Sequence, residues 1–251
     1  MSNIIIDDRY FLERIRNTYL FYRRFMKIYL LRLPLMDEDF VAKKNLLKFY
    51  LHTDDYGLLD VNNNSQLASL LGKIMVQYVY REQAAHDCYT YPLPFSYGKS
   101  GKPYITLCPN FYFNISHTKE WVAVAVGDAE LGIDIEKLRD YKPIVAKRFF
   151  HNDEYSFLTT LPSYLQDVFF TRLWVSKESY VKCIGTGIAN TFDKFAISIT
   201  NDAIEVKGND FPVFFKHYRY DELFISICSM SNTFPDDIVL LNIDEMQSAV
   251  F

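Results

Sequence analysis

Hydrophobic residues recur at helical spacing in several segments of the chain. In residues 65–83, Leu67, Leu70 and Ile74 lie three and four positions apart, the pattern of an amphipathic helix. The polar run before it offers Asn64 or Ser65 as the helix cap. The same spacing predicts four more helices, at residues 10–31, 39–51, 142–160 and 163–184. The last should end near Gly185.

Strand patterns dominate between and after these helices. "WVAVAVG" (121–127) is uniformly apolar and predicts a central strand, and "ELGIDIEK" (130–137) alternates after a short turn, so the two should form a hairpin. Further strands are predicted at 195–200, 213–220 and 223–229. Because helix-rich then strand-rich sequence occurs twice without a flexible linker, we predict two packed α+β halves, residues 1–127 and 128–251.

Composition indicates a globular protein. With 49% hydrophobic and 23% charged residues, the chain can bury a full core. A net charge of -4 gives no reason to expect nucleic-acid binding. Residues 1–127 hold 15 Lys and Arg against 12 Asp and Glu, a net charge of +3, and the remainder has a net charge of -7. The basic first half suits an anionic ligand or an acidic partner protein.

The thiols and the N-terminal segment predict a cytoplasmic location. The chain has four scattered cysteines without a CxxC pair: Cys88, Cys108, Cys183 and Cys228. This spacing favours reduced thiols over a zinc site or a disulfide framework. "FYRRFMKIYLLRLPLM" is apolar in places, but its four Lys and Arg residues argue against a signal peptide or a membrane span.

Two carboxylates alternate with apolar residues in "LGIDIE". Asp134 and Glu136 share the polar face of the predicted strand, beside Gly132. An exposed strand face is the commoner explanation of such a pair. The alternative is a Mg²⁺ site, because oxygen ligands suit this cation and its charge would cancel their repulsion.

"RLWVSKESYVK" (172–182) carries a second candidate group. On a helix, Trp174, Glu178 and Lys182 lie four residues apart on one side. One explanation is a surface Glu–Lys pair, worth about 0.3–0.5 kcal/mol, with the tryptophan anchored in the core. The other makes Glu178 a third acid beside the metal and Lys182 a cation for phosphate oxygens or a leaving group.

Two further motifs offer phosphate contacts. In "FNISHT", Ser116 and His117 could both donate hydrogen bonds to a phosphate, although a structural histidine is the commoner case. The G-x-S-x-G elbow of a hydrolase is absent. "GKSGKP" is not a Walker A loop, because Leu93 stands where its first glycine is required. It is a loop that presents Lys99 and Lys102.

Taken together and in this order, "GKPYI", "FNISHTKEWVAVAV", "LGIDIEK", "AKRFF" and "LWVSKESYVKCIGTGI" resemble the 4′-phosphopantetheinyl transferase family, in its Sfp-type branch. The resemblance implies an α+β fold of two similar halves in a pseudo-twofold arrangement, with coenzyme A in the cleft between them. It also implies a monomer that uses Mg²⁺ to transfer 4′-phosphopantetheine from coenzyme A to a serine of an acyl or peptidyl carrier protein. Adenosine 3′,5′-bisphosphate would be released.

The resemblance also implies roles for individual residues. Asp134, Glu136 and Glu178 match the acids of the metal site. Glu178 matches the proposed general base, which would take the serine proton directly or through a metal-bound water. Lys182 matches the lysine that neutralises the leaving bisphosphate.

Contacts to coenzyme A are implied in the same way. Ser116 and His117 match phosphate contacts, with His117 near the 3′-phosphate, and Lys102 with Pro103 matches the loop beside the nucleotide. In the N-terminal half the family's arginine before Leu-Leu-Gly is replaced by Ala68. Three lysines are the candidates to supply that positive charge instead: Lys43, Lys44 and Lys48.

Two other functions fit parts of the pattern. A Mg²⁺-dependent nucleotide phosphohydrolase could use the same acids, although their strand-then-helix order fits the transferase motif better. A non-catalytic relative could bind coenzyme A or a carrier protein, although Glu178 and Lys182 are both retained. Among carriers of fatty-acid, polyketide, nonribosomal-peptide or reductase systems, we expect one of secondary metabolism.

Overall fold

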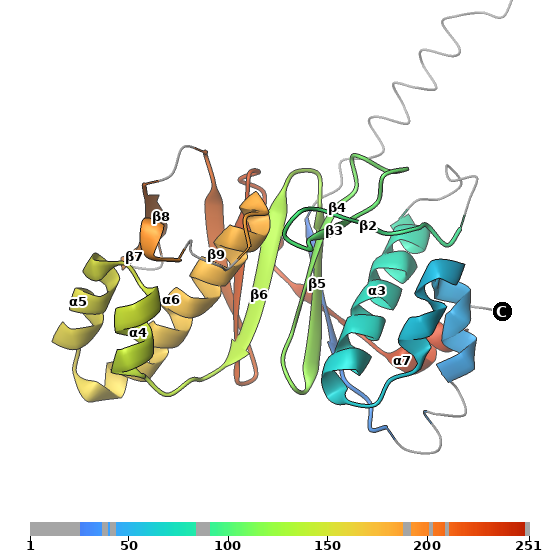
Figure 1. Cartoon of the computed structure of the whole chain (residues 1–251), viewed down its shortest axis with the longest axis horizontal. Coiled ribbons are helices and arrows are strands. Elements are labelled where there is room, and N and C mark those ends of the chain that lie inside the picture. The colour runs from blue at the N-terminus through green and yellow to red at the C-terminus, as the bar shows by residue number, and fades with distance from the viewer. Residues whose placement is uncertain are drawn as a thin grey trace, which may run out of the picture.

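The chain folds around two β-sheets that lie side by side, each covered on its outer side by a long helix (Figure 1). This architecture is that of a computed structural model, which describes residues 26–36, 40, 44–83, 91–187, 192–200, 203–208 and 211–248. It confirms the predicted α+β class. The division at residue 127 stays a prediction.

The first sheet has the strand order β11–β1–β5–β4. It consists of β1 (Lys27–Arg32), β4 (Tyr112–His117), β5 (Trp121–Gly127) and β11 (Ile238–Leu241). Strands β1, β5 and β4 are antiparallel, whereas β11 pairs in parallel with β1. The end of the chain therefore returns to the sheet of the N-terminal half. Helix α3 (Asn64–Gln83) packs on β4 and β5.

The second sheet has the strand order β6–β10–β9 and is antiparallel throughout. It consists of β6 (Leu131–Lys137), β9 (Phe214–Tyr220) and β10 (Leu223–Ser229). Helix α6 (Ser163–Ile184) packs across β6 and β10. It ends where predicted, at Gly185 with φ 71°.

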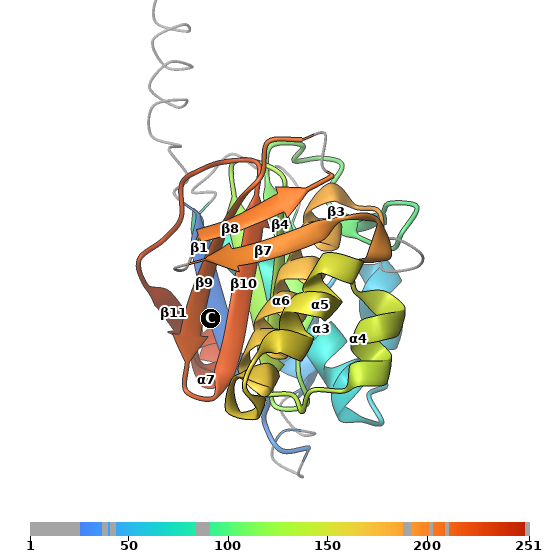
Figure 2. The same cartoon turned by 90° about the vertical axis from the view of Figure 1, so that its left-hand side faces the viewer.

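Shorter elements complete the fold, and Figure 2 shows the β7–β8 hairpin beside α5. They are η1 (Lys44–Tyr50), η2 (Thr53–Leu59), β2 (Ser96–Tyr97), β3 (Pro103–Tyr104), α4 (Pro143–Phe149), α5 (Asn152–Thr160), η3 (Phe192–Lys194), β7 (Ala196–Thr200), β8 (Ala203–Lys207) and α7 (Ile243–Ser248).

The uniform apolarity of β5 follows from its position, because both of its faces are covered. Val122 and Val124 belong to the core under α3, whereas Ala123 and Ala125 belong to a second core that joins the two sheets. Small residues on that second face allow the sheets to approach each other. A third core lies between α6, the helices α4 and α5 and the β7–β8 hairpin.

Some predicted elements were wrong. Strands β5 and β6 do not form a hairpin: β5 pairs with β1 and β4, and β6 pairs with β10. Residues 142–160 form two helices, because the chain is extended at Phe150, the cap of α4. Most of the predicted helix at 10–31 lies outside the described residues, and its end forms β1 instead. The predicted helix at 39–51 appears, within the described residues, mainly as the 3-10 helix η1.

Helix α3 appears where predicted, but its cap is Asn63, not Asn64 or Ser65. The side-chain oxygen of Asn63 accepts a hydrogen bond from the backbone nitrogen of Gln66 over 2.9 Å. This satisfies one of the otherwise unpaired N–H groups at the start of the helix.

Candidate active site

Asp134 is the centre of the candidate site. It projects from β6 toward α6 and is 5% exposed. Its Oδ1 accepts hydrogen bonds from Lys182 Nζ over 2.6 Å and from Ser116 Oγ over 2.8 Å. Its Oδ2 is buried without a hydrogen-bond partner among the described atoms. Such a buried carboxylate oxygen is costly unless a donor or a cation reaches it.

Strand β4 is linked to β6 by side chains instead of a backbone ladder. Asn114 Oδ1 accepts the backbone N–H of Ile133 over 3.0 Å, and Ser116 Oγ contacts the backbone nitrogen of Ile135 over 3.4 Å. The "NIS" segment of the sequence therefore holds the two sheets together at the site. Ser116 serves this link and Asp134 at once.

Gly132 allows α6 to lie directly on β6. A Cβ atom at this position would lie 2.9 Å from the carbonyl carbon of Lys182, and closer still to the backbone of Ser179 and Cys183. Only a residue without a side chain fits under the helix here. The glycine of "GIDIE" thereby brings Lys182 within reach of Asp134.

The three acids of the predicted metal site act on one another. Burial, together with the negative charges of Asp134 and Glu136, raises the pKa of Glu178 to about 7, even though Lys182 and Arg139 oppose the shift. Burial also raises the pKa of Glu136, as does the charge of Asp134, whereas Arg139 opposes the shift. The acids thus form one electrostatically coupled group.

Arg139 belongs to the site and was missed by the sequence-based reasoning. Its Nη1 donates to Glu136 Oε1 over 2.9 Å, and its guanidinium lies 4.3 Å from the ring centroid of Trp174. Its backbone nitrogen donates to Thr171 on α6. Only its position three residues after Glu136 could have suggested this role. Trp174 therefore holds a cation as well as packing against the third core.

A cavity of about 610 Å³ lies beside these groups, where the first sheet and its helix α3 meet the end of β6 in the second sheet. Its walls are the start of α3, the β4–β5 turn and the end of β6: Asn64, Ser65, His117, Thr118, Lys119, Glu120, Glu136, Lys137, Leu138 and Arg139. His117 and Glu136 therefore face one cavity, of a size typical of ligand pockets. The surrounding protein desolvates the His117 ring and lowers its pKa, with a further contribution from Lys182.

The other predicted ligand contacts are spread out. Lys102 Nζ donates to Glu130 Oε2 over 2.6 Å and to the carbonyl oxygens of Leu131 and Cys183. It therefore lies beside the C-terminal end of α6. Pro103 begins the short strand β3. Lys44 begins η1, and Ala68 is fully buried in the first core. Lys43 lies outside the described residues.

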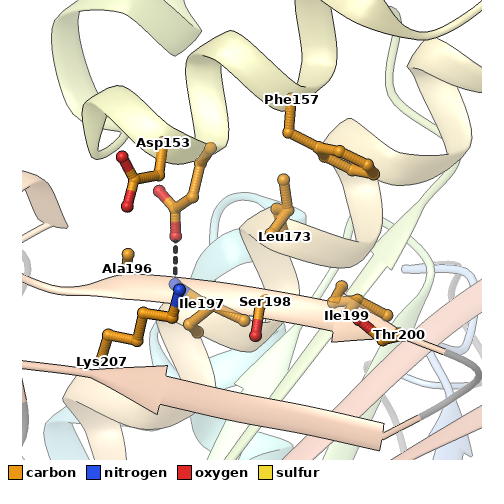
Figure 3. A pocket seen from close by; sticks show the side chains of 10 residues that line it. Asp153, Phe157, Leu173, Ala196, Ile197, Ser198, Ile199, Thr200 and Lys207 are labelled. Atoms are coloured by element: carbon orange, nitrogen blue, oxygen red, sulfur yellow. Dashed lines mark hydrogen bonds between the residues drawn. The ribbon is translucent and has the colours of Figure 1, made fainter.

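A buried ion pair fixes α6 one residue before Glu178. Lys177 Nζ donates to Glu154 Oε1 over 2.9 Å and to the Phe195 carbonyl oxygen over 2.8 Å, with both charged side chains at most 1% exposed. Glu154 also accepts the backbone N–H of Ile197, the dashed line in Figure 3. The small cavity drawn there, about 170 Å³, lies between α5 and β7.

The acids suit Mg²⁺ by their chemistry, although they are not closed around an ion. Within the described residues, no three His, Cys, Asp or Glu side chains converge closely enough to enclose a metal. Lys182 and Arg139 instead act as counter-ions to Asp134 and Glu136. Mg²⁺ typically takes only one or two carboxylates and completes its shell with water and phosphate oxygens. The unpartnered Oδ2 of Asp134 and the coupled acids fit such a site.

Within the part of the chain that the structure describes, no helix has the length and apolar character that a membrane span requires.

Comparison with known proteins shows the family to which the chain belongs. Residues 130–228 match the 4′-phosphopantetheinyl transferase superfamily. A holo-(acyl-carrier-protein) synthase from Bacillus anthracis, solved in complex with CoA (3′,5′-ADP), is 18% identical with a TM-score of 0.35, over 40% of this chain and 94% of that one.

Two curated relatives are more similar. The 4′-phosphopantetheinyl transferase Sfp of Bacillus subtilis strain 168 is 34% identical over 182 residues, which span 71% of this chain and 80% of Sfp. The transferase ffp of Bacillus subtilis is 33% identical over 182 residues, with the same two coverages. The superfamily match at residues 130–228 includes β6 and α6, the strand and the helix that carry the acids described above. The chain therefore belongs to the 4′-phosphopantetheinyl transferase family, in the branch that contains Sfp.

Proposed function

We propose that this protein is a 4′-phosphopantetheinyl transferase, which moves the 4′-phosphopantetheine group of coenzyme A to a serine hydroxyl of an apo carrier protein. The observation that supports it most is the coupled group of Asp134, Glu136 and Glu178, with Lys182 beside it, in a chain of this family. The cavity of about 610 Å³ lies next to these acids. Coenzyme A would bind there.

The reaction exchanges one phosphorus–oxygen bond for another. The serine oxygen forms a bond to the β-phosphorus of coenzyme A, the phosphoanhydride bond breaks, and adenosine 3′,5′-bisphosphate leaves. The serine proton passes to Glu178. The pKa of Glu178 is about 7 in the metal-free protein, and bound Mg²⁺ would lower it, so that the carboxylate is ionised at neutral pH and can accept the proton. Phosphoryl transfer depends mostly on position and electrostatics, so no covalent enzyme intermediate is needed.

The remaining residues hold the reactants and balance charge. Asp134, Glu136 and Glu178 would hold Mg²⁺, which supplies positive charge to the phosphate oxygens where negative charge accumulates. Lys182 would turn from Asp134 to the leaving bisphosphate. Ser116 and His117 would donate hydrogen bonds to phosphate oxygens of coenzyme A.

The nucleotide end of coenzyme A would be held by lysines from separate segments of the chain. Lys102 and Pro103 would lie near the nucleotide, with the Lys102 ammonium released from Glu130 to reach it. Ala68 is buried in the core and offers no charge, so Lys44 and its neighbour Lys48 are the candidates for the 3′-phosphate. We also propose a cytoplasmic monomer. Cys183 and Cys228 are buried thiols outside any disulfide, which suits a reducing compartment.

The test is to incubate the protein with Mg²⁺, coenzyme A and apo carrier proteins from several pathways, and to weigh each carrier intact. A gain of one phosphopantetheine mass, lost in Glu178→Gln and Asp134→Ala, is expected. No gain on any carrier, although the protein still binds coenzyme A, would instead identify a non-catalytic relative. Release of inorganic phosphate from a nucleotide would identify a phosphohydrolase.

A further inference from the structure

One side of α6 carries a row of polar and aromatic residues, each about one helical turn from the next. The row consists of Asp167, Thr171, Trp174 and Glu178, spaced by four, three and four positions. Its first three residues contact the segment 139–141, which directly follows β6. Its last residue is the third acid of the candidate site. The helix that supplies this acid therefore also holds the chain just beyond Glu136.

The backbone at Arg139 is tied to this row by hydrogen bonds. The N–H of Arg139 donates to Thr171 Oγ1 over 2.9 Å, and the N–H of Tyr141 donates to Asp167 Oδ1 over 2.7 Å. Thr171 is fully buried, and its own hydroxyl donates to the Asp167 carbonyl oxygen over 2.8 Å. The proton of that hydroxyl is thereby used, so its oxygen is oriented as the acceptor for Arg139.

The Arg139 side chain is held as well. Its guanidinium lies 4.3 Å from the ring centroid of Trp174, and its Nη1 donates to Glu136 Oε1 over 2.9 Å. A planar guanidinium stacked on an indole ring keeps one orientation, which a lysine ammonium would not. Among the described residues, the other oxygen of Glu136, Oε2, accepts no hydrogen bond. A cation can therefore reach Oε2 without displacing Arg139.

Arg139 could affect a bound cation in two opposite ways. Its positive charge reaches both glutamates, because burial raises the pKa of Glu136 and of Glu178 and Arg139 opposes both shifts. As a charge alone, it would repel Mg²⁺. As a fixed hydrogen-bond partner, it would orient a metal-binding carboxylate, and losing such a partner typically weakens metal affinity by about 10–100-fold. Removal of Arg139 distinguishes the two effects by their sign.

We propose that Arg139 is a positioning residue for the metal site, which fixes Glu136 relative to Glu178 so that both can bind one Mg²⁺. Thr171 and Trp174 hold Arg139 in place for this task. The role rests on the proposed function, because it requires the acids to bind the ion.

Lys182 contrasts with Arg139. Its ammonium donates directly to Asp134 Oδ1 over 2.6 Å on a flexible side chain, so it competes with a cation for that carboxylate. Arg139 leaves one oxygen of its carboxylate open and is fixed by the helix. The two basic residues of the site therefore have opposite effects on Mg²⁺ affinity.

Titration calorimetry of the whole protein with Mg²⁺ alone, without coenzyme A or a carrier, tests this role. Arg139→Gln should weaken Mg²⁺ binding at least about tenfold, or about 1.4 kcal/mol. Repulsion alone predicts tighter binding, because the variant removes a positive charge. The control is Arg148→Gln, which should bind Mg²⁺ like the unchanged protein. Arg148 is an exposed arginine over the Phe149 ring on α4, outside the cavity walls.

Two variants of Thr171 separate position from charge. Thr171→Val removes the acceptor of the Arg139 N–H but keeps every charge, and it should weaken Mg²⁺ binding about fivefold, or about 1 kcal/mol. Thr171→Ser keeps the hydroxyl and should restore the affinity of the unchanged protein. Thermal unfolding shows that each variant is folded at the temperature of the titration.

The outcomes distinguish this role from the proposed function. Equal or tighter Mg²⁺ binding by Arg139→Gln overturns the positioning role and leaves the metal site and the transfer reaction standing. Equal binding by Thr171→Val and Thr171→Ser overturns the part that α6 plays in holding Arg139. If the unchanged protein binds no Mg²⁺, the metal site itself fails, and this role fails with it.

Discussion

The contact between α6 and β6 at Gly132 gives a strong test of how this site is built. Replacing Gly132 by alanine adds one methyl group at a point where the backbones of the strand and the helix touch. The new Cβ would lie 2.9 Å from the Lys182 carbonyl carbon and closer to the backbone of Ser179 and Cys183, distances that real Cβ atoms essentially never show. No side-chain rotation relieves this clash, because the opposing atoms belong to the backbone.

The helix must therefore move by about 1 Å, and both stability and activity should fall. Overpacking a close-packed interior costs about 1–3 kcal/mol, and we expect the upper end because a whole helix shifts. Glu178 and Lys182 move with that helix. Because a displacement of about 1 Å at a catalytic group can lower the rate about 100-fold, kcat/KM for transfer should fall at least this far.

The assay combines urea unfolding with the initial rate of carrier-protein modification in the folded protein. The matched control is Gly57→Ala, since nothing lies within 4 Å of a Cβ atom at Gly57 in η2. That variant should unfold within about 1 kcal/mol of the unchanged protein and retain its rate. If Gly132→Ala behaved like Gly57→Ala in both measurements, the close contact between α6 and β6 would be refuted.

Three further predictions concern the buried charges along α6. Lys177→Met leaves Glu154 buried without its counter-ion and should lower the free energy of unfolding by about 3–5 kcal/mol. Adding Glu154→Gln should restore more than half of this lost free energy, because the unpaired charge is then removed. If the double variant were no more stable than Lys177→Met, the ion-pair account would be contradicted. Burial holds the pKa of Glu178 at about 7 in the metal-free folded protein, so its contribution to stability is complete below pH ~4.5 and is lost as the pH rises through about 7. Glu178→Gln should therefore stabilise the metal-free protein at pH 8 by roughly 2–3 kcal/mol and much less at pH 5; an equal effect in urea unfolding at the two pH values would contradict this. Lys182→Met removes the ammonium 2.6 Å from Asp134, so calorimetry without coenzyme A should show Mg²⁺ binding about tenfold tighter while transfer is lost; unchanged or weaker Mg²⁺ binding would argue against competition between the two cations.

The sequence predicts where helices and strands lie better than it predicts which strands pair with each other. Helices α3 and α6 and strands β9 and β10 lie where the hydrophobic spacing indicates. The hairpin of β5 and β6 was wrong because a short turn can also carry the chain from one sheet to another. What decides between these outcomes is the availability of better partners, β1 and β4 for one strand and β10 for the other. Those partners are far away in the sequence.

The same limit applies to the candidate site. The alternation in "LGIDIE" predicts that Asp134 and Glu136 share a face, which the structure confirms by their register with β10. It does not predict that this face is covered by α6, so that Asp134 is 5% exposed. The contacts of Arg139 with Trp174 and of Asn114 with Ile133 could not be predicted either, because each joins segments that only the fold brings together.

The central claim is that phosphopantetheine moves from coenzyme A to a carrier serine at the acids of β6 and α6. The most direct measurement compares the release of adenosine 3′,5′-bisphosphate with an apo carrier and with the same carrier whose target serine is replaced by alanine. Release in the presence of Mg²⁺ should match the mass gained by the carrier, one molecule for one, and should stop without the serine. Release that continues without the serine, or a carrier modified equally well by Glu178→Gln, would contradict the account.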